Sequence, residues 1–478
     1  MNLVAYTLKP PTGVSRALVG CFLEGEEGEE EEELLALVRG VGTVEIVQVL
    51  TPPPPSPRTN GKEGTQEAKE REGNGAILHT LCSQPTFSAI RAWACLRPVG
   101  GTKDLLAVTS DAGMLALVEL VARPAKTASH AVAYHLQRVA SLLLGTSGCA
   151  RSVPGQYVAA DPSGRAVMVS SMDGHLTCAV VLRNAATGAI ELRRSRVGGD
   201  LGAVSGQATV LDAAGAHVGV GPPRFLLLVG GDEADGARAR ERARAKEEDG
   251  LSLPEESLKH VLVLELDLET NTLAPAGRLP VSSTGSALLP LPPPLPPSPP
   301  PFPQACGPFL VLSENWVSVH HPWAFKEARA PIPRPRGLPS AQGVLPVAWT
   351  LWEGREQGKG GRWRVLMQGE GGDLYAVHIQ CPEMTEAGPA STSTSTSTST
   401  PSSLPSLRIV ALTDWIPPCT ALAALTGRWS GRREGGEEGG GEAGGRAGGR
   451  VQAPVVRGGD GRPRLVRAQG GREGGREG

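Results

Sequence analysis

Short β-favouring segments joined by tight turns constrain this chain more than any other feature, and residues 148–171 contain the clearest example. Residues 157–160 and 166–169 are short apolar runs that favour strands. Between them, the sequence Asp-Pro-Ser-Gly at 161–164 has Asp, Pro and Gly at the first, second and fourth positions of a β-turn, which each of them favours. A Val-Pro-Gly-Gln segment at 153–156 breaks the chain just before the first run. This stretch therefore predicts a β-hairpin.

Comparable apolar segments recur along most of the chain. We predict further strands at residues 3–8, 16–22, 34–38, 44–50, 76–81, 89–96, 105–109, 114–121, 175–182, 188–192, 225–229, 260–268, 310–313, 316–320, 344–352, 364–367, 374–379, 407–412 and 419–425, and another that follows 260–268 after a turn at 269–271. Residues 130–144 fit a helix as well as a strand, and we favour a strand and a loop. Roughly two dozen strands indicate a sandwich, a barrel or a propeller. Insertions blur any repeat of about 40–50 residues, so periodicity alone does not decide between them.

Low-complexity segments interrupt this pattern. Gly contributes 62 and Pro 42 of the 478 residues, a share close to that of low-complexity sequences. The composition of five segments cannot offset the entropy lost on ordering, so we expect them to be non-strand and poorly packed. Four are insertions near 51–74, 232–250, 290–303 and 383–406, and the fifth is a disordered Gly/Arg/Glu-rich tail at 427–478. The folded domain is expected to cover residues 1–425.

Charge and composition exclude several classes of partner. The net charge of −2 argues against a broad basic surface for nucleic acid or an anionic membrane. No stretch approaches the ~18 apolar residues of a membrane-spanning helix, and no secretory signal is apparent, so we expect a soluble intracellular protein. The cysteines form no C-x-x-C pair, which indicates reduced thiols of a cytosolic or nuclear protein. They are residues 21, 82, 95, 149, 178, 306, 381 and 419.

Motifs of enzyme active sites are incomplete in this sequence. Residues 145–148 come nearest to the G-x-S-x-G of a nucleophile elbow, and we interpret them as a loop. The Gly-Lys pairs at 61–62 and 358–359 are not followed by the Ser or Thr of a phosphate-binding loop. Residues 40–42 have neither a third Gly nor a following helix, which indicates a hairpin turn. We therefore expect no catalytic or cofactor-binding residues.

The histidines and a basic segment give no stronger signal. His130 and His135 are five residues apart with no Glu between them, unlike the two ligands of an H-E-x-x-H motif. His320 and His321 end a strand, where neighbouring side chains point to opposite faces. We favour structural or solvent-exposed roles for all four and expect no metal or other cofactor. Two arginines at 334 and 336 are candidates for an acidic partner, but an exposed loop is the favoured interpretation.

Several segments together resemble a known family. Besides residues 148–171, the resemblance rests on residues 100–104, 110–113, 264–268, 313–315, 332–334, 368–374 and 413–417. They are similar to the first β-propeller of a family of triple-propeller scaffolds. Its branches include splicing factor 3b subunit 3, the large damage-specific DNA-binding protein of cullin ubiquitin ligases and the largest cleavage and polyadenylation specificity factor subunit. Residues 164–168 favour the splicing branch, and the resemblance covers residues 1–425 apart from the insertions.

The resemblance implies an all-β fold, a β-propeller of about six to seven blades with an incomplete last blade. Residues 3–7 would pair into the blade that holds the last strands, since ring closure removes sheet edges. The blade that begins at 407–412 would lack its outer strands, and such an edge favours aggregation. Residues 427–478 depart from the family, which continues with further strands, two more propellers and a helical portion. We favour a truncated or mis-spliced gene model over an RNA-binding tail, whose arginines would be offset by interleaved Glu residues.

The resemblance also implies a function. The chain would be a non-catalytic scaffold of the U2 small nuclear ribonucleoprotein that acts in pre-mRNA splicing in the nucleus. Its partners would be other splicing factor 3b subunits, with RNA contacted through the complex and with no membrane or small-molecule substrate. Two alternatives stay open. One is a propeller adaptor of a cullin ubiquitin ligase or a cleavage and polyadenylation subunit, and the other is an enzyme on a propeller scaffold.

Overall fold

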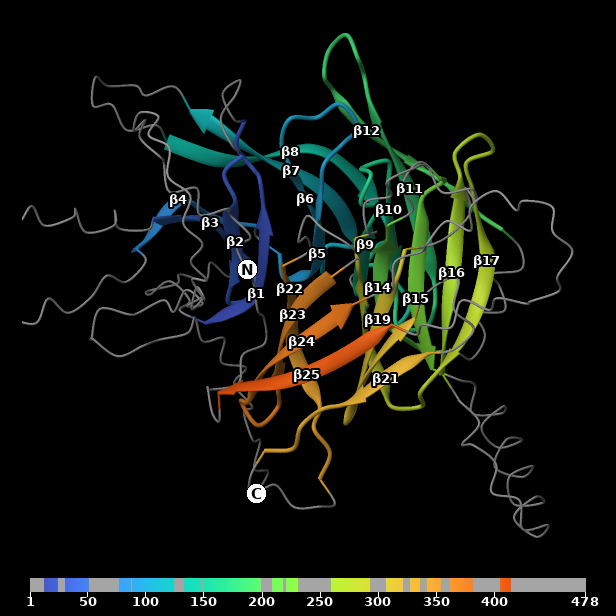
Figure 1. The fold of residues 1–478 in the computed structure, drawn as a ribbon. Helices are drawn as coiled ribbons and strands as arrows, with labels where there is room; N and C mark the ends of the chain where they lie inside the picture. Colours follow the sequence, from blue (N-terminus) through green and yellow to red (C-terminus); the bar gives the residue numbers. More distant parts are fainter. Residues whose placement is uncertain are drawn as a thin grey trace, which may run out of the picture.

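The computed structural model is a ring of β-sheets (Figure 1). It describes residues 13–24, 31–50, 77–86, 88–123, 133–147, 149–198, 209–217, 221–230, 259–292, 307–320, 327–335, 342–353, 362–380 and 405–413. Every regular element within these ranges is a strand. None of the described residues belongs to a helix that is long and apolar enough to cross a bilayer. The predicted all-β fold is confirmed.

Six sheets follow one another along the chain, and the strands within each sheet are antiparallel neighbours in sequence order, with one exception described below. The first blade consists of β1 (Val14–Gly20), β2 (Leu34–Arg39), β3 (Thr43–Leu50) and β4 (Ile77–Pro85). The second consists of β5 (Ile90–Leu96), β6 (Leu105–Ser110), β7 (Met114–Arg123) and β8 (Ala133–Leu143). The third consists of β9 (Tyr157–Ala160), β10 (Ala166–Ser170), β11 (Leu176–Arg183) and β12 (Ile190–Arg194).

The fourth blade consists of β14 (Val210–Ala216), β15 (Arg224–Gly230), β16 (Lys259–Asp267) and β17 (Thr272–Val281). A short strand, β13 (Arg196–Val197), adds to its outer edge in parallel with β17. The fifth consists of β18 (Gly285–Pro290), β19 (Phe309–Ser313), β20 (Trp316–His320) and β21 (Ala328–Pro331). The sixth consists of β22 (Pro346–Glu353), β23 (Arg362–Gly369), β24 (Leu374–Gln380) and β25 (Ser406–Thr413).

The first strand of each blade lies on the inside of the ring. Thus β5 lies beside β9, β9 beside β14 and β14 beside β18, whereas the last strands β4, β8 and β12 are neighbours on the outside. This is the arrangement of a β-propeller, so the predicted architecture is confirmed, with six blades among the described residues. The strands predicted at 3–8 and 419–425 lie outside the described ranges, and the incomplete last blade stays a prediction.

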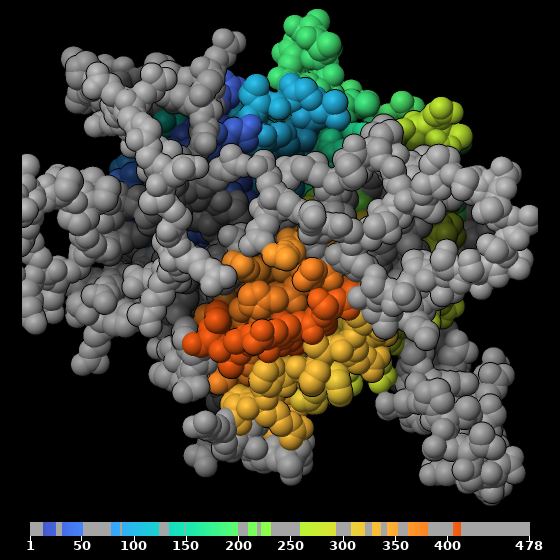
Figure 2. Space-filling model, in the orientation of Figure 1, coloured from blue at the N-terminus to red at the C-terminus, as the bar shows by residue number. Residues whose placement is uncertain are grey.

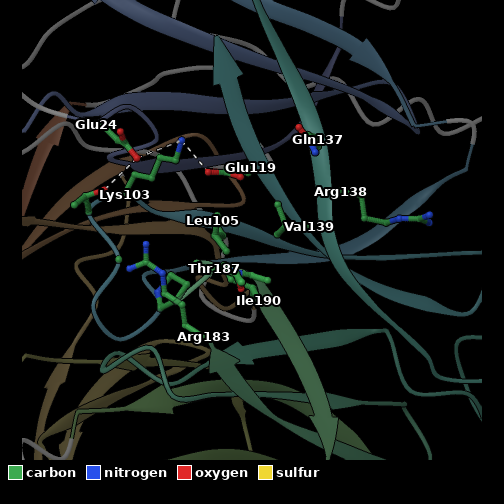
Figure 3. Close-up of a pocket in the computed structure, with 15 residues that line it drawn as sticks. Glu24, Lys103, Leu105, Glu119, Gln137, Arg138, Val139, Arg183, Thr187 and Ile190 are labelled. Atoms are coloured by element: carbon green, nitrogen blue, oxygen red, sulfur yellow. Dashed lines mark hydrogen bonds and ion pairs between the residues drawn. The ribbon is translucent and has the colours of Figure 1, made fainter. Parts of the chain in front are cut away.

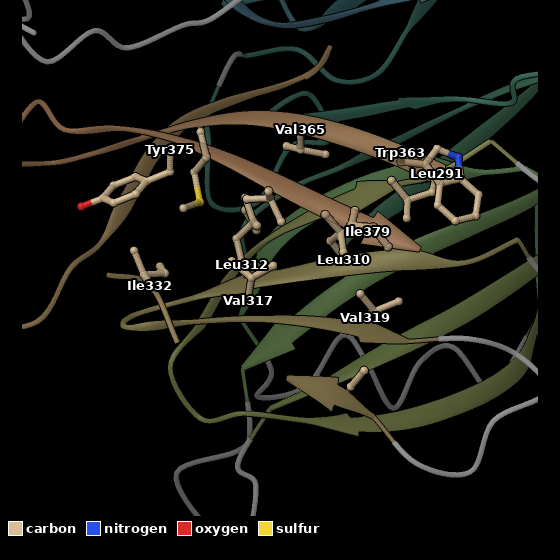
Figure 4. Packing of buried hydrophobic residues seen from close by; sticks show 14 of the residues in the cluster. Leu291, Leu310, Leu312, Val317, Val319, Ile332, Trp363, Val365, Tyr375 and Ile379 are labelled. Carbon is tan, nitrogen blue, oxygen red and sulfur yellow. The ribbon is translucent and has the colours of Figure 1, made fainter. Parts of the chain in front are cut away.

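The hydrophobic core lies between the blades, because side chains alternate between the two faces of each sheet. In β6, Leu106 and Val108 pack toward the first blade, whereas Leu105 and Ala107 pack toward the third. Similar clusters fill the spaces between the third and fourth blades and between the fourth and fifth. The cluster between the fifth and sixth blades contains the largest buried side chain, Trp363 (Figure 4). Each blade is therefore held by its neighbours.

The predicted hairpin at 157–169 is formed by β9 and β10. In its turn, the Gly164 N–H donates to the Asp161 carbonyl at 2.8 Å, and Gly164 has a φ of +77°. A Cβ atom at Gly164 would lie 1.6 Å from the carbonyl oxygen of Arg97 in the second blade. Only glycine fits this position, because the backbone conformation and the neighbouring blade both exclude a side chain.

The expectation that residues 290–303 are poorly packed is wrong for the first of them. Pro290 ends β18 and pairs with Phe309. Leu291 is fully buried, and its N–H donates to the Pro308 carbonyl at 2.9 Å. Since β18 is the innermost strand of its blade, it tolerates a proline as edge strands do. In the segment 383–406, Pro405 is buried and Ser406 begins β25, so this insertion also ends earlier than predicted.

The prediction that residues 407–412 begin an incomplete blade is also wrong. They belong to β25, which pairs with β24 over the whole range Ser406–Thr413 and is the fourth strand of the sixth blade. Figure 2 shows β25 in red-orange on the outer surface, beside β21 of the fifth blade. Because β25 completes a four-stranded blade, residues 407–412 do not begin the incomplete blade from which aggregation was expected.

Several predicted boundaries are refined. Within the ambiguous segment 130–144, residues 133–143 form the single long strand β8. Four strands were missed: β13, β14, β18 and β21. Two of these, β14 and β18, are innermost strands rich in Gly, Ala and Ser, and the other two have only two and four residues, so none carries a strong β-favouring pattern. The segments 51–74, 232–250 and 427–478 lie outside the described residues.

Candidate interaction surface

The glycine motifs lie at turns and loops of the propeller. Residues 40–42 connect β2 to β3, with Gly40 at a φ of +58°, so the predicted hairpin turn is confirmed. Gly145 follows β8, and its N–H donates to the Gly113 carbonyl at 3.2 Å. Gly148 and the Gly-Lys pairs at 61–62 and 358–359 lie outside the described residues.

Two of the four histidines singled out are described. The Nδ1 atom of His135 in β8 lies 3.1 Å from the Val121 carbonyl oxygen. His320 in β20 stacks on Phe309 with 5.2 Å between ring centroids, and its Nε2 lies 3.2 Å from the Ser318 hydroxyl. Burial lowers the pKa of His320. His130 and His321 lie outside the described ranges, and within those ranges no group of three His, Cys, Asp or Glu residues is placed to hold a metal ion.

The two ends of the blades form faces of different character. The tight turns β2–β3, β6–β7, β10–β11, β19–β20 and β23–β24 gather on one face, here named the turn face. The connections from the first to the second and from the third to the fourth strand of each blade gather on the opposite face, here named the loop face. Three of the predicted insertions, near 51–74, 290–303 and 383–406, depart from strand ends on the loop face.

An aromatic residue marks the turn face of the fifth blade. Trp316 begins β20 and is 40% exposed, and the Arg329 guanidinium lies 6.0 Å from the centroid of its ring. The neighbouring Leu345 is 37% exposed. Asn315 holds this segment in place, because its Oδ1 accepts the Val344 N–H at 2.8 Å. An exposed Trp–Arg pair is typical of protein–protein contacts. The other candidate cation, Arg334, is exposed in the loop after β21, and Arg336 lies outside the described residues.

A cavity of about 320 Å³ opens on the loop face between the second and third blades (Figure 3). Its floor contains Leu105, Val139 and Ile190, and its rim contains the β5–β6 and β11–β12 connections. Lys103 Nζ forms an ion pair with Glu119 at 2.8 Å and lies 4.0 Å from Glu24. Arg138 and Arg183 also line the cavity, so its charged lining contains both cations and carboxylates.

Polar contacts cross the boundaries between blades and fix the shape of these surfaces. Asp104 of the second blade accepts the Cys21 N–H of the first at 2.8 Å. Thr109 Oγ1 of the second blade donates to the Gly155 carbonyl at 2.7 Å, just before the third. Such contacts join neighbouring blades directly. The sequence analysis missed Trp316 and the cavity as sites; exposure of a tryptophan depends on the tertiary fold.

Comparison with known proteins shows which proteins this chain is similar to. The family described as "RSE1/DDB1/CPSF1 first beta-propeller" matches residues 67–425. "Spliceosome-associated protein 130 A" of Arabidopsis thaliana is 29% identical over 64% of this chain and 22% of its own length. "Splicing factor 3B subunit 3" of Drosophila melanogaster is 28% identical over 65% of this chain and 22% of its own. "Pre-mRNA-splicing factor rse1" of Neurospora crassa is 28% identical over 81% and 27%. The chain thus spans about a quarter of the length of these relatives.

Proposed function

Since this chain belongs to the RSE1/DDB1/CPSF1 first beta-propeller family, we propose that it is a non-catalytic scaffold in pre-mRNA splicing. The observation that carries the proposal is its similarity to a plant protein named as spliceosome-associated and to an insect and a fungal protein named as splicing factors. The expected family resemblance is confirmed by this match. A propeller with an exposed Trp–Arg pair supports a binding role.

Partners and location follow from the same argument. The relatives are spliceosomal proteins by name, which supports action in the nucleus. We infer that other splicing factor 3b subunits are the protein partners and that RNA is contacted through the complex. No small-molecule substrate or cofactor is part of this proposal. The ubiquitin-ligase and polyadenylation branches of the family are the competing outcomes of the test below.

We also propose that the domain extends over residues 1–425, with 427–478 as a separate tail. Val14, Leu37 and Val47 form a buried cluster on the first blade, separate from the cluster shared with the second. This cluster supports a seventh blade, formed from residues before β1 and after β25, that packs against the free side of the first blade. Ring closure of that kind removes exposed sheet edges.

Affinity capture from nuclear extract tests the proposed function. The tagged 478-residue chain should retain splicing factor 3b proteins, identified by mass spectrometry. If the chain instead retained a cullin or cleavage and polyadenylation proteins, its function would be that of another branch of the family. Retention of none of these by a monodisperse chain would overturn the scaffold proposal.

A pair of variants tests which face binds. Trp316→Ala removes the exposed aromatic from the turn face, and Val99→Ala changes a 60% exposed residue on the loop face. We expect the first variant to lose most of the captured partner and the second to retain it. The opposite pattern would assign binding to the loop face.

A further inference from the structure

Exposed arginines gather on the outer strands of the second and third blades and on the short strand β13. They are Arg138 in β8, Arg183 in β11, Arg193 and Arg194 in β12, and Arg196 in β13. These four strands contain one carboxylate, Glu191, and no lysine, so they carry a net charge of +4, although the whole chain carries −2. None of the five arginines forms an ion pair with a carboxylate among the residues that the structure describes. This outer surface therefore has a local excess of positive charge.

The pairing of β11 with β12 decides which way two of these arginines face. Arg194 lies opposite Ala179, which is buried in the cluster shared with the second blade. The Arg194 Nη2 donates to the Leu143 carbonyl of β8 at 2.5 Å. Because side chains alternate along a strand, Arg183 lies on the same sheet face as Ala179. Its Nη1 donates to the Gly100 carbonyl in the connection between β5 and β6. Both arginines thus bridge the outer gap between the second and third blades.

The cavity of about 320 Å³ lies in this gap and has arginines beside an apolar floor. In Figure 3, Arg138 and Arg183 lie on opposite sides of Leu105 and Val139. The cavity's lysine, Lys103, is less free to meet a ligand, because it forms an ion pair with Glu119 at 2.8 Å. We name this site the arginine groove; it consists of Arg138, Arg183 and Arg194 with a floor of Leu105, Val139 and Ile190.

Exposed aliphatic side chains accompany the arginines and favour a protein as the partner. Leu143 at the end of β8 is 59% exposed, and Leu182 and Val197, next to Arg183 and Arg196 in sequence, are each 40% exposed. Protein–protein interfaces are enriched in arginine and depleted of lysine. Single-stranded nucleic acid is held by basic groups together with exposed aromatic rings. The tyrosine of these strands, Tyr134, packs instead against the cluster between the first two blades.

We propose that the arginine groove binds an acidic peptide segment of a partner protein, in which aliphatic residues are flanked by Asp or Glu. The aliphatic side chains enter the cavity over Leu105 and Val139, and the flanking carboxylates meet Arg138 and Arg183 on either side. A guanidinium can hold a carboxylate through two parallel hydrogen bonds, which suits it to this role. The groove lies apart from Trp316 on the turn face, so this proposal does not depend on what binds there.

Fluorescence anisotropy of a labelled peptide with the full-length chain tests the proposal. The probe is the peptide Glu-Glu-Glu-Leu-Leu-Glu-Glu-Glu. We expect saturable binding that weakens as salt rises from about 0.1 to 1 M, because the screening length falls from about 10 to about 3 Å. A peptide with Gln in place of Glu lacks the charge, and one with Ser in place of Leu lacks the groups that fill the cavity, so both should bind more weakly. No saturable binding of the probe, or equal binding of the three peptides, would overturn the proposal.

Variants of the chain locate the binding site. Arg138→Gln and Arg183→Gln should each weaken peptide binding by roughly two- to fivefold, the range expected for an exposed ion pair. Arg138→Lys keeps the positive charge and should retain most of the affinity. The matched control is Arg408→Gln, because Arg408 is also an exposed arginine on an outer strand, β25, but belongs to the sixth blade. If Arg408→Gln weakened binding as much as the groove variants, the attraction would be non-specific and the proposal would be wrong.

Two further measurements separate a peptide from RNA and from another surface. A labelled oligouridylate is titrated against the same variants. If Arg138→Gln and Arg183→Gln weakened binding of this RNA but not of the peptide, the groove would be a site for a phosphate backbone, which contradicts the proposal. Hydrogen exchange with the unmodified chain should show slower exchange in residues 137–143 and 183–194 when the peptide is added. Protection confined to other segments would place the peptide elsewhere and overturn the assignment.

Discussion

The carboxylate of Asp212 in β14 accepts the backbone N–H of Leu288 in β18 at 2.8 Å, and so joins the innermost strands of the fourth and fifth blades. Its other oxygen accepts the Ala213 N–H at 2.8 Å. A register shift between Val210 and Asp212 directs the side chain toward the neighbouring blade. Desolvation nevertheless raises the pKa of Asp212 to about 6. The contact that joins the two blades therefore contains a carboxyl group whose protonation changes near neutral pH.

We expect this carboxyl to make stability depend on pH. Because the pKa of Asp212 is higher in the folded chain than the ordinary value of about 3.9, the folded state keeps a proton that the unfolded state has lost. Stability should therefore fall as pH rises from about 4 to about 6. The slope is at most about 1.4 kcal/mol per pH unit, an upper bound because the residue is partly exposed. Asp212→Asn should abolish this slope, and Asp173→Asn, at an exposed site, should preserve it. Urea unfolding at each pH measures this slope. If the stability of the unmodified chain and of Asp212→Asn changed with pH in the same way, Asp212 would not be the group that causes it.

Gly164→Ala should destabilise the chain strongly. The new Cβ would meet the Arg97 carbonyl, and alanine would also have to adopt a positive φ. Gly188→Ala is the matched control, since its φ is +68° but its Cβ would meet only the Arg183 guanidinium at 4.0 Å. The control should lose about 1–2 kcal/mol for the backbone conformation alone, and Gly164→Ala clearly more. Chemical denaturation measures the free energy of unfolding of both variants. Equal losses would show that the backbone at Arg97 moves away from the new methyl group at little cost.

The boundary between the first two blades should depend on Asp104. This carboxylate accepts the Cys21 N–H and the Arg97 Nε, both at 2.8 Å, and its side chain is 14% exposed. Asp104→Ala should cost about 2–3 kcal/mol, because it removes two hydrogen bonds to a charged carboxylate, one from the Cys21 N–H and one from Arg97. Asp173→Ala removes the exposed ion pair with Arg151 and should cost about 0–1 kcal/mol. A similar loss for both variants in thermal unfolding would argue against a structural role for Asp104.

Trp363 should be the most sensitive aromatic residue. It is 1% exposed between the fifth and sixth blades (Figure 4), and its Nε1 donates to the Pro292 carbonyl at 3.0 Å. Trp363→Phe removes the donor and leaves a small cavity, so we expect a loss of about 2–3 kcal/mol in urea unfolding. Trp316→Phe, at the exposed tryptophan, should change stability by less than about 0.5 kcal/mol. If the two variants were equally stable, the Pro292 contact would contribute nothing.

A deletion tests whether residues 427–478 contribute to the stability of the propeller. Deletion of residues 427–478 should leave the stability of the propeller unchanged, because that segment has scarcely any apolar residues to bury. The comparison is the urea midpoint of the full chain and of residues 1–426. A lower midpoint for the shorter chain would assign a structural role to the tail.

The sequence by itself determined the local elements. The Asp-Pro-Ser-Gly turn at 161–164 predicted the β9–β10 hairpin, and most strands lie where β-favouring apolar runs predicted them, because hydrogen-bonded turns and alternating side chains are local properties. It also indicated that the prolines after 290 interrupt a strand, but not that Pro290 and Leu291 pack. That depends on the partner strand β19 and on Trp363, which lies in the same buried cluster as Leu291 and donates to the carbonyl of Pro292, 71 residues earlier in the chain.

Only the tertiary structure decided how the blades meet. Nothing near Asp212 or Gly164 in the sequence identifies Leu288 or the Arg97 carbonyl as neighbours, since each contact crosses from one blade to another. The assignment of 407–412 was wrong for the same reason. The sequence pattern of a single strand does not show which position that strand takes within a sheet, and β25 is the fourth strand because it pairs with β24.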